Sequence, residues 1–208
     1  VPSIAADQIG AYAYTGNGTA AAAAAVTPAA NGLTANEDVT IVGPLGTAIT
    51  TAEAADSAKQ TVNRINAVTS QTGVSATAQT YAQLSSTSAV GESYTIKING
   101  ISSGNFTISS SSVEDAVRAI NSVAGSTGVT ATSTSDGKVL MFDGDGDDIT
   151  IENDAAGTSL RLQKMDYSGT DTVGTAVALA TTGGTDASRV SGAIKAVSSD
   201  PFTITQAG

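Results

Sequence analysis

The 208-residue sequence contains no cysteine and no histidine. Without cysteine, the chain can form no disulfide framework, no thiolate nucleophile and no thiolate metal site. Without histidine, it lacks the commonest metal ligand and the commonest general base. These absences exclude zinc hydrolases, Ser-His-Asp triads and Cys-His pairs. We therefore expect a protein that is not an enzyme, with no catalytic residues and no bound cofactor.

Aromatic and basic residues are also scarce. Aromatic residues make up 4% of the chain, there is no tryptophan, and much of the 40% apolar content is alanine. Small side chains bury little area, and buried apolar area stabilises a fold by roughly 25 cal/mol per Å². We therefore expect a thin core spread over two small subdomains. Nine basic residues face 19 acidic ones, which leaves no basic stripe for a nucleic-acid partner.

Long hydrophobic runs are missing as well. The small-residue run from Ala20 to Val26 is far shorter than the ~18 apolar residues of a membrane span. It also lacks the basic flank that is typical of a signal peptide. We expect no membrane partner, and we predict a short helix or an irregular loop at residues 20–25.

One stretch of the sequence occurs twice, 55 residues apart, at 58–77 and at 113–132. Both copies have Ile-Asn, Thr-Gly-Val and Ala-Thr at matching positions. Apolar residues at helical spacing predict a helix in each copy, and each Thr-Gly-Val predicts a helix end followed by a strand. A duplicated unit of this size favours a modular fold and a surface-building role over a single catalytic centre.

The first copy belongs to a predicted unit of two strands, a helix and a strand region. The predicted strands lie at 39–42, 48–50 and 74–84, and the first two are joined by a turn at 43–46. Thr50 and Glu53 have the spacing of a capping box at the helix start, with Ala55 as the first residue of the apolar stripe. The helix is expected to end before Gly73.

The second copy repeats this plan. Strands at 94–98 and 106–108 are predicted to form a hairpin around Asn99-Gly100. Ser111 and Glu114 have the spacing of a second capping box, and Gly125 is predicted to end the helix. Further strands are predicted at 129–131, 138–142, 148–151 and 160–162.

One helix packed across a small antiparallel sheet is the simplest way to bury both apolar faces. We therefore predict an α+β fold with two such subdomains in tandem, at residues 39–92 and 93–162. Residues 1–38 and 163–208 are expected to form an irregular, β-rich base, with a strand from Ile9 to Tyr14, a short helix at 190–197 and a strand at 202–204. A parallel α/β fold would need more helices than the two that are evident.

The sharpest local feature is an acidic segment in which Asp143, Asp145 and Asp147 alternate with glycine. Carboxylates at the first, third and fifth positions resemble a calcium loop, and Asp154 falls at the twelfth position. However, Asp148 stands where an EF-hand needs glycine, and the twelfth residue is Asp instead of Glu. The alternative is an acidic hairpin turn between the flanking strands. We expect no metal centre, with the three alternating aspartates as a weak candidate cation site.

The duplicated segment resembles the Ile-Asn repeat motif of bacterial flagellins and hook-associated proteins. The residues that carry the resemblance are Ile65-Asn66 with 72–76, and Ile120-Asn121 with 127–131, and the second copy continues it through 136–140 and 147–151. Two edge segments, 9–12 and 205–208, resemble the places where a flagellin chain leaves and re-enters its inner domain.

The resemblance implies an outer, surface-exposed portion of a flagellin. Such a portion would contribute to motility, to the surface properties of the filament and to its antigenicity. The partners would be other flagellin subunits in a helical filament, contacted through polymerising helices that this sequence lacks, so we expect a monomeric fragment. The implied location is the extracellular flagellum, reached through the flagellar secretion system. Exposed Ser and Thr residues are candidate sites for O-linked glycans.

Two alternatives to an outer flagellin portion remain open. A filament-cap or hook-associated protein shares the motif and assists assembly. A glycan-binding surface adhesin would instead need exposed aromatic platforms. The candidates for such platforms are Tyr12, Tyr14, Tyr81, Tyr94 and Tyr167.

Overall fold

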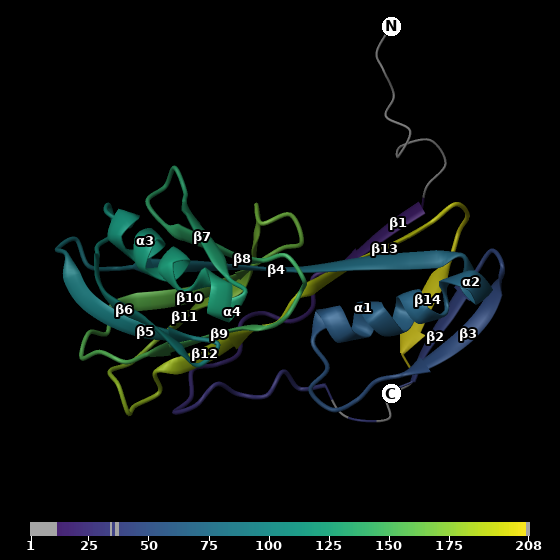
Figure 1. The fold of residues 1–208 in the computed structure, drawn as a ribbon, viewed down its shortest axis with the longest axis horizontal. Coiled ribbons are helices and arrows are strands. Elements are labelled where there is room, and N and C mark those ends of the chain that lie inside the picture. Colours follow the sequence, from purple (N-terminus) through teal and green to yellow (C-terminus); the bar gives the residue numbers. More distant parts are fainter. Residues whose placement is uncertain (1–11, 34, 36–37, 207–208) are drawn as a thin grey trace, which may run out of the picture.

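A computed structural model describes residues 12–33, 35 and 38–206 of the chain. The fold is α+β but consists mostly of strands, arranged in three sheets with four short helices among the described residues (Figure 1). Every pairing between the named strands is antiparallel, so the parallel α/β alternative is wrong.

The strands are β1 (Tyr12–Gly16), β2 (Asp38–Gly43), β3 (Gly46–Thr51), β4 (Val74–Ser86), β5 (Glu92–Ile98), β6 (Ile101–Ile108), β7 (Thr130–Ser133), β8 (Val139–Asp143), β9 (Ile149–Asn153), β10 (Leu160–Met165), β11 (Thr172–Ala178), β12 (Ala187–Val190), β13 (Ala193–Ser198) and β14 (Thr203–Gln206). The helices are α1 (Ala58–Ala67), α2 (Thr69–Thr72), α3 (Glu114–Ser122) and α4 (Ala124–Thr127).

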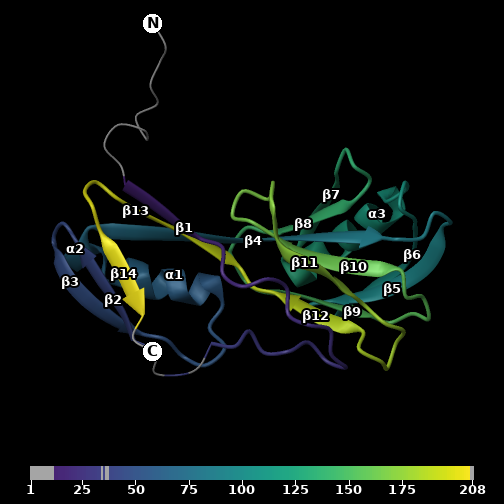
Figure 2. The same ribbon diagram turned by 180° about the vertical axis from the view of Figure 1, so that it is seen from behind.

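Strand β4, with 13 residues, is the longest described strand and takes part in both ends of the molecule. Its first half, through Gln79, pairs with β13, and its second half, from Thr80, pairs with β8 and β10. The largest sheet therefore runs β1-β13-β4-β10-β11, with β8 and β7 added beside β4. Figures 1 and 2 show β4 passing along the molecule, with α1 at one end and α3 at the other. We call these ends the α1 half and the α3 half.

Each half has its own buried apolar cluster, and the two clusters share no residue. In the α3 half, the sheet β12-β9-β5-β6 packs with α3 and the second half of β4 around fully buried side chains such as Tyr94 and Ile120. In the α1 half, the smaller cluster joins α1 to β4, β13 and the sheet β14-β2-β3. Its buried members are Ile41, Val62, Ile65, Val74, Ala76 and Ala196.

Most strands predicted from alternation and turn residues are present. The hairpin β5-β6 turns at Asn99 and Gly100, whose φ values of 49° and 82° are those that a tight two-residue hairpin requires. Strands β2 and β3 form the other predicted hairpin, and β14 overlaps the strand predicted at 202–204 but begins at Thr203. Strand β1 begins at Tyr12; residues 9–11 of the strand predicted there lie outside the described residues.

Both predicted capping boxes are wrong. Helix α1 begins after Ser57, whose backbone N–H donates to Gln60 Oε1 at 2.5 Å. Ala55, with a φ of 63°, lies in the turn before the helix. Helix α3 begins at Glu114, with Val113 in the N-cap position. Ser111 donates its backbone N–H to the hydroxyl of Ser109 instead of capping the helix.

The structure differs from two further local predictions and agrees with a third. Gly125 does not end the second helix; a kink at Val123 leads into α4, and Gly128, with a φ of 76°, ends it. Residues 190–197 form the end of β12 and most of β13 instead of a helix, because their backbone pairs with β9 in one sheet and with β1 and β4 in another. Residues 20–25 are irregular, with only a bridge from Ala25 to β12, which agrees with the loop alternative.

The segment from 163 to 206 supplies strands to all three sheets. Strands β11 and β13 join the largest sheet, β12 pairs with β9, and β14 pairs with β2. These strands complete the two helix-bearing halves, so in the described residues the expected separate base is absent. The first and last described strands, β1 and β14, both lie in the α1 half (Figure 2).

Candidate functional site

The repeated motif builds the same local structure twice, beginning with the asparagine of each Ile-Asn pair. Asn66 Nδ2 donates to the backbone O of Ala76 at 2.9 Å, and its Oδ1 accepts the Ala76 N–H at 2.8 Å. Asn121 makes the same two bonds with Ala131, both at 2.8 Å. Each side-chain amide therefore donates one hydrogen bond to the strand backbone and accepts one from it, as a neighbouring strand would. These two bonds fix the helix to the strand that follows.

The threonine of each Thr-Gly-Val also has the same role in both copies. Thr72 Oγ1 donates to the backbone O of Val68 at 3.1 Å and accepts the Val74 N–H at 3.2 Å. Thr127 makes the equivalent two bonds, both at 3.2 Å. The glycine after each threonine has the left-handed conformation that ends the helix and starts the strand.

These observations give the motif a structural role. The isoleucines, Ile65 and Ile120, are buried one in each apolar cluster. The neighbouring asparagines are bonded to strand backbone, and the threonine hydroxyls are bonded at the helix ends. The polar side chains of the motif are thus engaged in hydrogen bonds to backbone, and the geometry, the same in both copies, docks a helix on a sheet.

The acidic segment is not a hairpin. Strand β8 pairs with β4 and β7, whereas β9 pairs with β5 and β12, so residues 144–148 cross between two sheets. Asp143 holds this crossing, because its Oδ1 accepts the backbone N–H groups of Asp145, Gly146 and Asp147 at 3.0, 3.0 and 3.2 Å. Burial raises the pKa of the Asp143 carboxyl above its ordinary value, against the opposing effect of these N–H donors.

The acidic side chains do not converge on one point. Lys59 Nζ lies 3.0 Å from Asp145 Oδ2 and 2.8 Å from Asp147 Oδ2, and these hydrogen bonds raise the pKa of Lys59. Asp154 instead accepts a hydrogen bond from the hydroxyl of Thr182. Among residues 12–33, 35 and 38–206, no group of three or more acidic side chains is placed to hold a metal ion. The three aspartates that were the weak candidate cation site therefore make hydrogen bonds and ion pairs with other groups of the chain.

A buried lysine, missed in the sequence, lies between the two halves. Lys164 is 1% exposed, and its ammonium donates to the backbone oxygens of Ser191 and Gly192. Burial lowers the pKa of Lys164 to about 8, opposed by the charge of Asp148. Its sequence signal was the alternation Leu160, Leu162, Lys164, which places the lysine on the buried face of β10.

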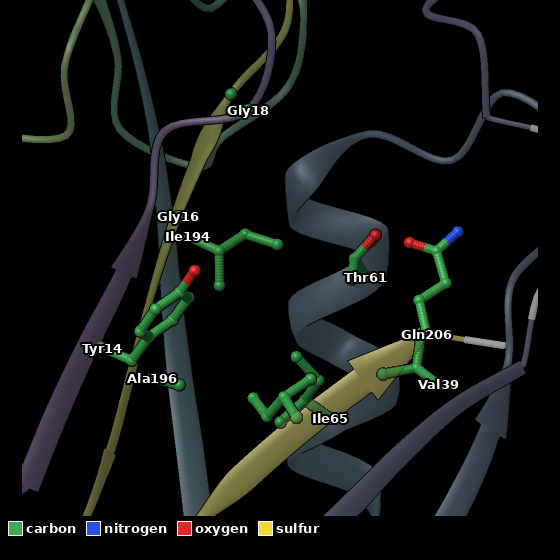
Figure 3. A pocket seen from close by; sticks show the side chains of 11 residues that line it. Tyr14, Gly16, Gly18, Val39, Thr61, Ile65, Ile194, Ala196 and Gln206 are labelled. Carbon is green, nitrogen blue, oxygen red and sulfur yellow. The ribbon is translucent and has the colours of Figure 1, made fainter. Parts of the chain in front are cut away.

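A groove in the α1 half opens between β1 and β14 (Figure 3). It has a volume of about 340 Å³ and is mainly apolar. Tyr14 and Ile194 form one wall, and Thr61 and Ile65 of α1 lie opposite them, with Gln206 at the far side. Tyr14 is 66% exposed, which leaves an aromatic surface at the rim of the groove.

The five tyrosines do not form a common platform. Tyr12 and Tyr14 are exposed on β1, whereas Tyr94 is fully buried. The ring of Tyr81 stacks on Phe142 with centroids 4.6 Å apart, and the Tyr167 hydroxyl lies 2.8 Å from that of Thr77. Only the β1 pair therefore retains the exposure that a sugar-binding platform needs.

The sequence matches no model of a known protein family and no curated protein. None of the helices in the described part of the chain has the length and apolarity needed to cross a lipid bilayer, and α1, the longest, has 10 residues.

We expect Asn66→Ala and Asn121→Ala each to lower the free energy of unfolding by about 1–3 kcal/mol, because each removes a pair of hydrogen bonds to partly buried strand backbone. The matched control is Asn105→Ala, whose amide bonds only the exposed hydroxyl of Ser93, and we expect its effect to stay within about 0.5 kcal/mol. Urea unfolding followed by circular dichroism measures all three variants. Equal effects at the three positions would contradict the role of the motif.

Lys164 predicts that stability rises between about pH 8 and pH 10.5. The ordinary lysine pKa is 10.5 and the folded-state pKa is about 8, so in this window the unfolded chain binds a proton that the folded protein has released. Stability then increases with pH, by on the order of 3 kcal/mol in total. Urea unfolding at several pH values should show this rise in the wild type and its loss in Lys164→Met. Parallel pH profiles for the two proteins would contradict a lowered pKa of the buried Lys164 ammonium.

Proposed function

We propose that this chain is the outer, surface-exposed portion of a bacterial flagellin. The observation that carries the proposal is the Ile-Asn motif, which forms the same helix-to-strand hydrogen bonds at Asn66 and at Asn121. We take the two halves to be tandem helix-on-sheet subdomains derived from one duplicated unit. Their role is to cover the filament and to set its surface properties and antigenicity, without catalysis.

The course of the chain supports this proposal. The first and last described strands, β1 and β14, flank the same groove, so both described ends of the chain lie in the α1 half. A domain inserted into a longer subunit requires such an arrangement, with the α3 half pointing away. The partners would be other flagellin subunits, and the location would be the extracellular flagellum.

The surface chemistry also fits a solvated exterior. The net charge is −10, and part of the exposed charge is paired within the chain, as Lys59 is with Asp145 and Asp147. An excess of one charge keeps a crowded, repetitive surface soluble. Exposed Ser and Thr side chains remain candidate sites for O-linked glycans.

A second candidate function is glycan binding by a surface adhesin. The specific observation in its favour is Tyr14, whose exposed ring borders the apolar groove. Sugar rings stack on such aromatic faces, and Thr61 would supply a polar group nearby. A filament-cap or hook-associated protein is the remaining alternative, since it shares the Ile-Asn motif.

One labelling experiment separates the three functions. Antibodies raised against residues 1–208 are applied to cells that produce the protein, and bound antibody is located by immunogold electron microscopy. The flagellin proposal predicts gold particles along the whole length of the flagellar filaments. Label confined to the filament tip or the hook would favour the cap or hook-associated alternative, and label on the cell surface without filaments would favour the adhesin.

A further inference from the structure

The junction between the two halves consists mainly of polar side chains and glycines, with the small apolar residues Ala58 and Ala78 beside them. Strand β4 passes through it, and the partner of β4 changes there from β13 at Gln79 to β8 at Thr80. The two clusters share no residue, so no common apolar core spans the two halves. Besides β4 itself, the contacts that join the halves are the polar ones beside the middle of that strand.

The acidic segment supplies most of these contacts. Asp147 accepts hydrogen bonds from Thr80 Oγ1 at its backbone O (2.7 Å), from Ser57 Oγ at Oδ1 (3.0 Å) and from Lys59 Nζ at Oδ2 (2.8 Å). The backbone N–H of Lys59 also donates to the backbone O of Gly146 at 3.1 Å. A segment that follows β8 of the α3 half is thereby bound to the first turn of α1 in the other half.

A second row of contacts lies beside the first. Asp148 Oδ2 accepts bonds from Arg189 Nη1 at 2.9 Å and from Asn31 Nδ2 at 3.3 Å. The same Asn31 amide donates to the backbone O of Asp56, just before α1, at 2.8 Å. Asp148 therefore connects β12 of the α3 half, through Asn31, to the chain that leads into α1.

Two glycines let these elements approach closely. A Cβ on Gly192 would lie 2.7 Å from Ala58 Cβ, 2.7 Å from Thr80 Oγ1 and 2.9 Å from the backbone O of Gly146. A Cβ on Gly146, which has a φ of 84°, would lie 2.4 Å from Ala78 Cβ. Helix α1, strand β4, the acidic segment and the link from β12 to β13 thus meet at one place, with no space for a larger residue.

From this arrangement we propose that the acidic segment, residues 143–148, is a latch that fixes the angle between the α1 half and the α3 half. When its contacts with Ser57 and Lys59 are broken, the two halves bend about the middle of β4. The Lys59 and Asp147 side chains are 39% and 45% exposed, so the latch is accessible to solvent and ions and can be opened without unfolding either apolar cluster. The inference concerns the isolated chain and does not depend on the proposed function.

Distances between spin labels test the latch directly. The chain has no cysteine, so Gln71→Cys in α2 and Ser122→Cys in α3 give one exposed label in each half. Pulsed electron–electron double resonance measures the distance between the two labels. It should give a single narrow distance distribution for the otherwise wild-type protein. We expect this narrow peak to be lost in Asp147→Ala and in Lys59→Ala, and to be kept in Asp200→Ala, which removes an exposed acid outside the junction.

Two further arms keep the test decisive. The charge exchange Lys59→Asp with Asp147→Lys restores the ion pair and should restore the narrow peak. Circular dichroism shows that each variant remains folded, and raising the salt from about 0.05 M to about 1 M tests the wild type itself, since screening should broaden its distribution. A narrow, unchanged distribution in both alanine variants and at high salt would overturn the proposal, as would a broad distribution in the wild type at low salt.

Discussion

The rest of the structure depends on one interaction, the pair of hydrogen bonds between an asparagine side chain and the backbone of the following strand. Asn66 and Asn121 lie on helices but bond like strand residues, to Ala76 and Ala131. These bonds fix both the angle and the register of each helix on its sheet. They matter more in this fold than in most because the α1 cluster contains few large side chains and cannot by itself select one packing.

The apolar side chains of the molecule are buried in two clusters that share no residue. The larger cluster, in the α3 half, contains many Ile and Leu side chains, and the smaller one lies in the α1 half. The region between them is left to hydrogen bonds, ion pairs and closely packed glycines, and β4 is the strand that joins them. Charged residues that looked like a cation site in the sequence are thus occupied in joining the halves.

The sequence was sufficient wherever a local pattern had one physical solution. The spacing of Val62 and Ile65, or Asn99-Gly100 in a hairpin, allows few alternatives. Predictions failed where several residues could play one role. Ser57 with Gln60 has the same cap spacing as Thr50 with Glu53, and the spacing alone does not select between them, although the helix begins after Ser57. The crossing at 144–148 depends on β8 pairing with β4, a strand far earlier in the chain, which no local signal specifies.

Native-state hydrogen exchange of two backbone amides tests the central claim most directly. The N–H groups of Ala76 and Ala131 each donate to an asparagine side chain. Nuclear magnetic resonance of the wild-type protein should therefore find both amides protected to a similar degree as the neighbouring amides within the sheet. Exchange of either amide at the rate of an exposed loop would show that the asparagine does not hold the strand, and would contradict the claim that these bonds dock each helix on its sheet.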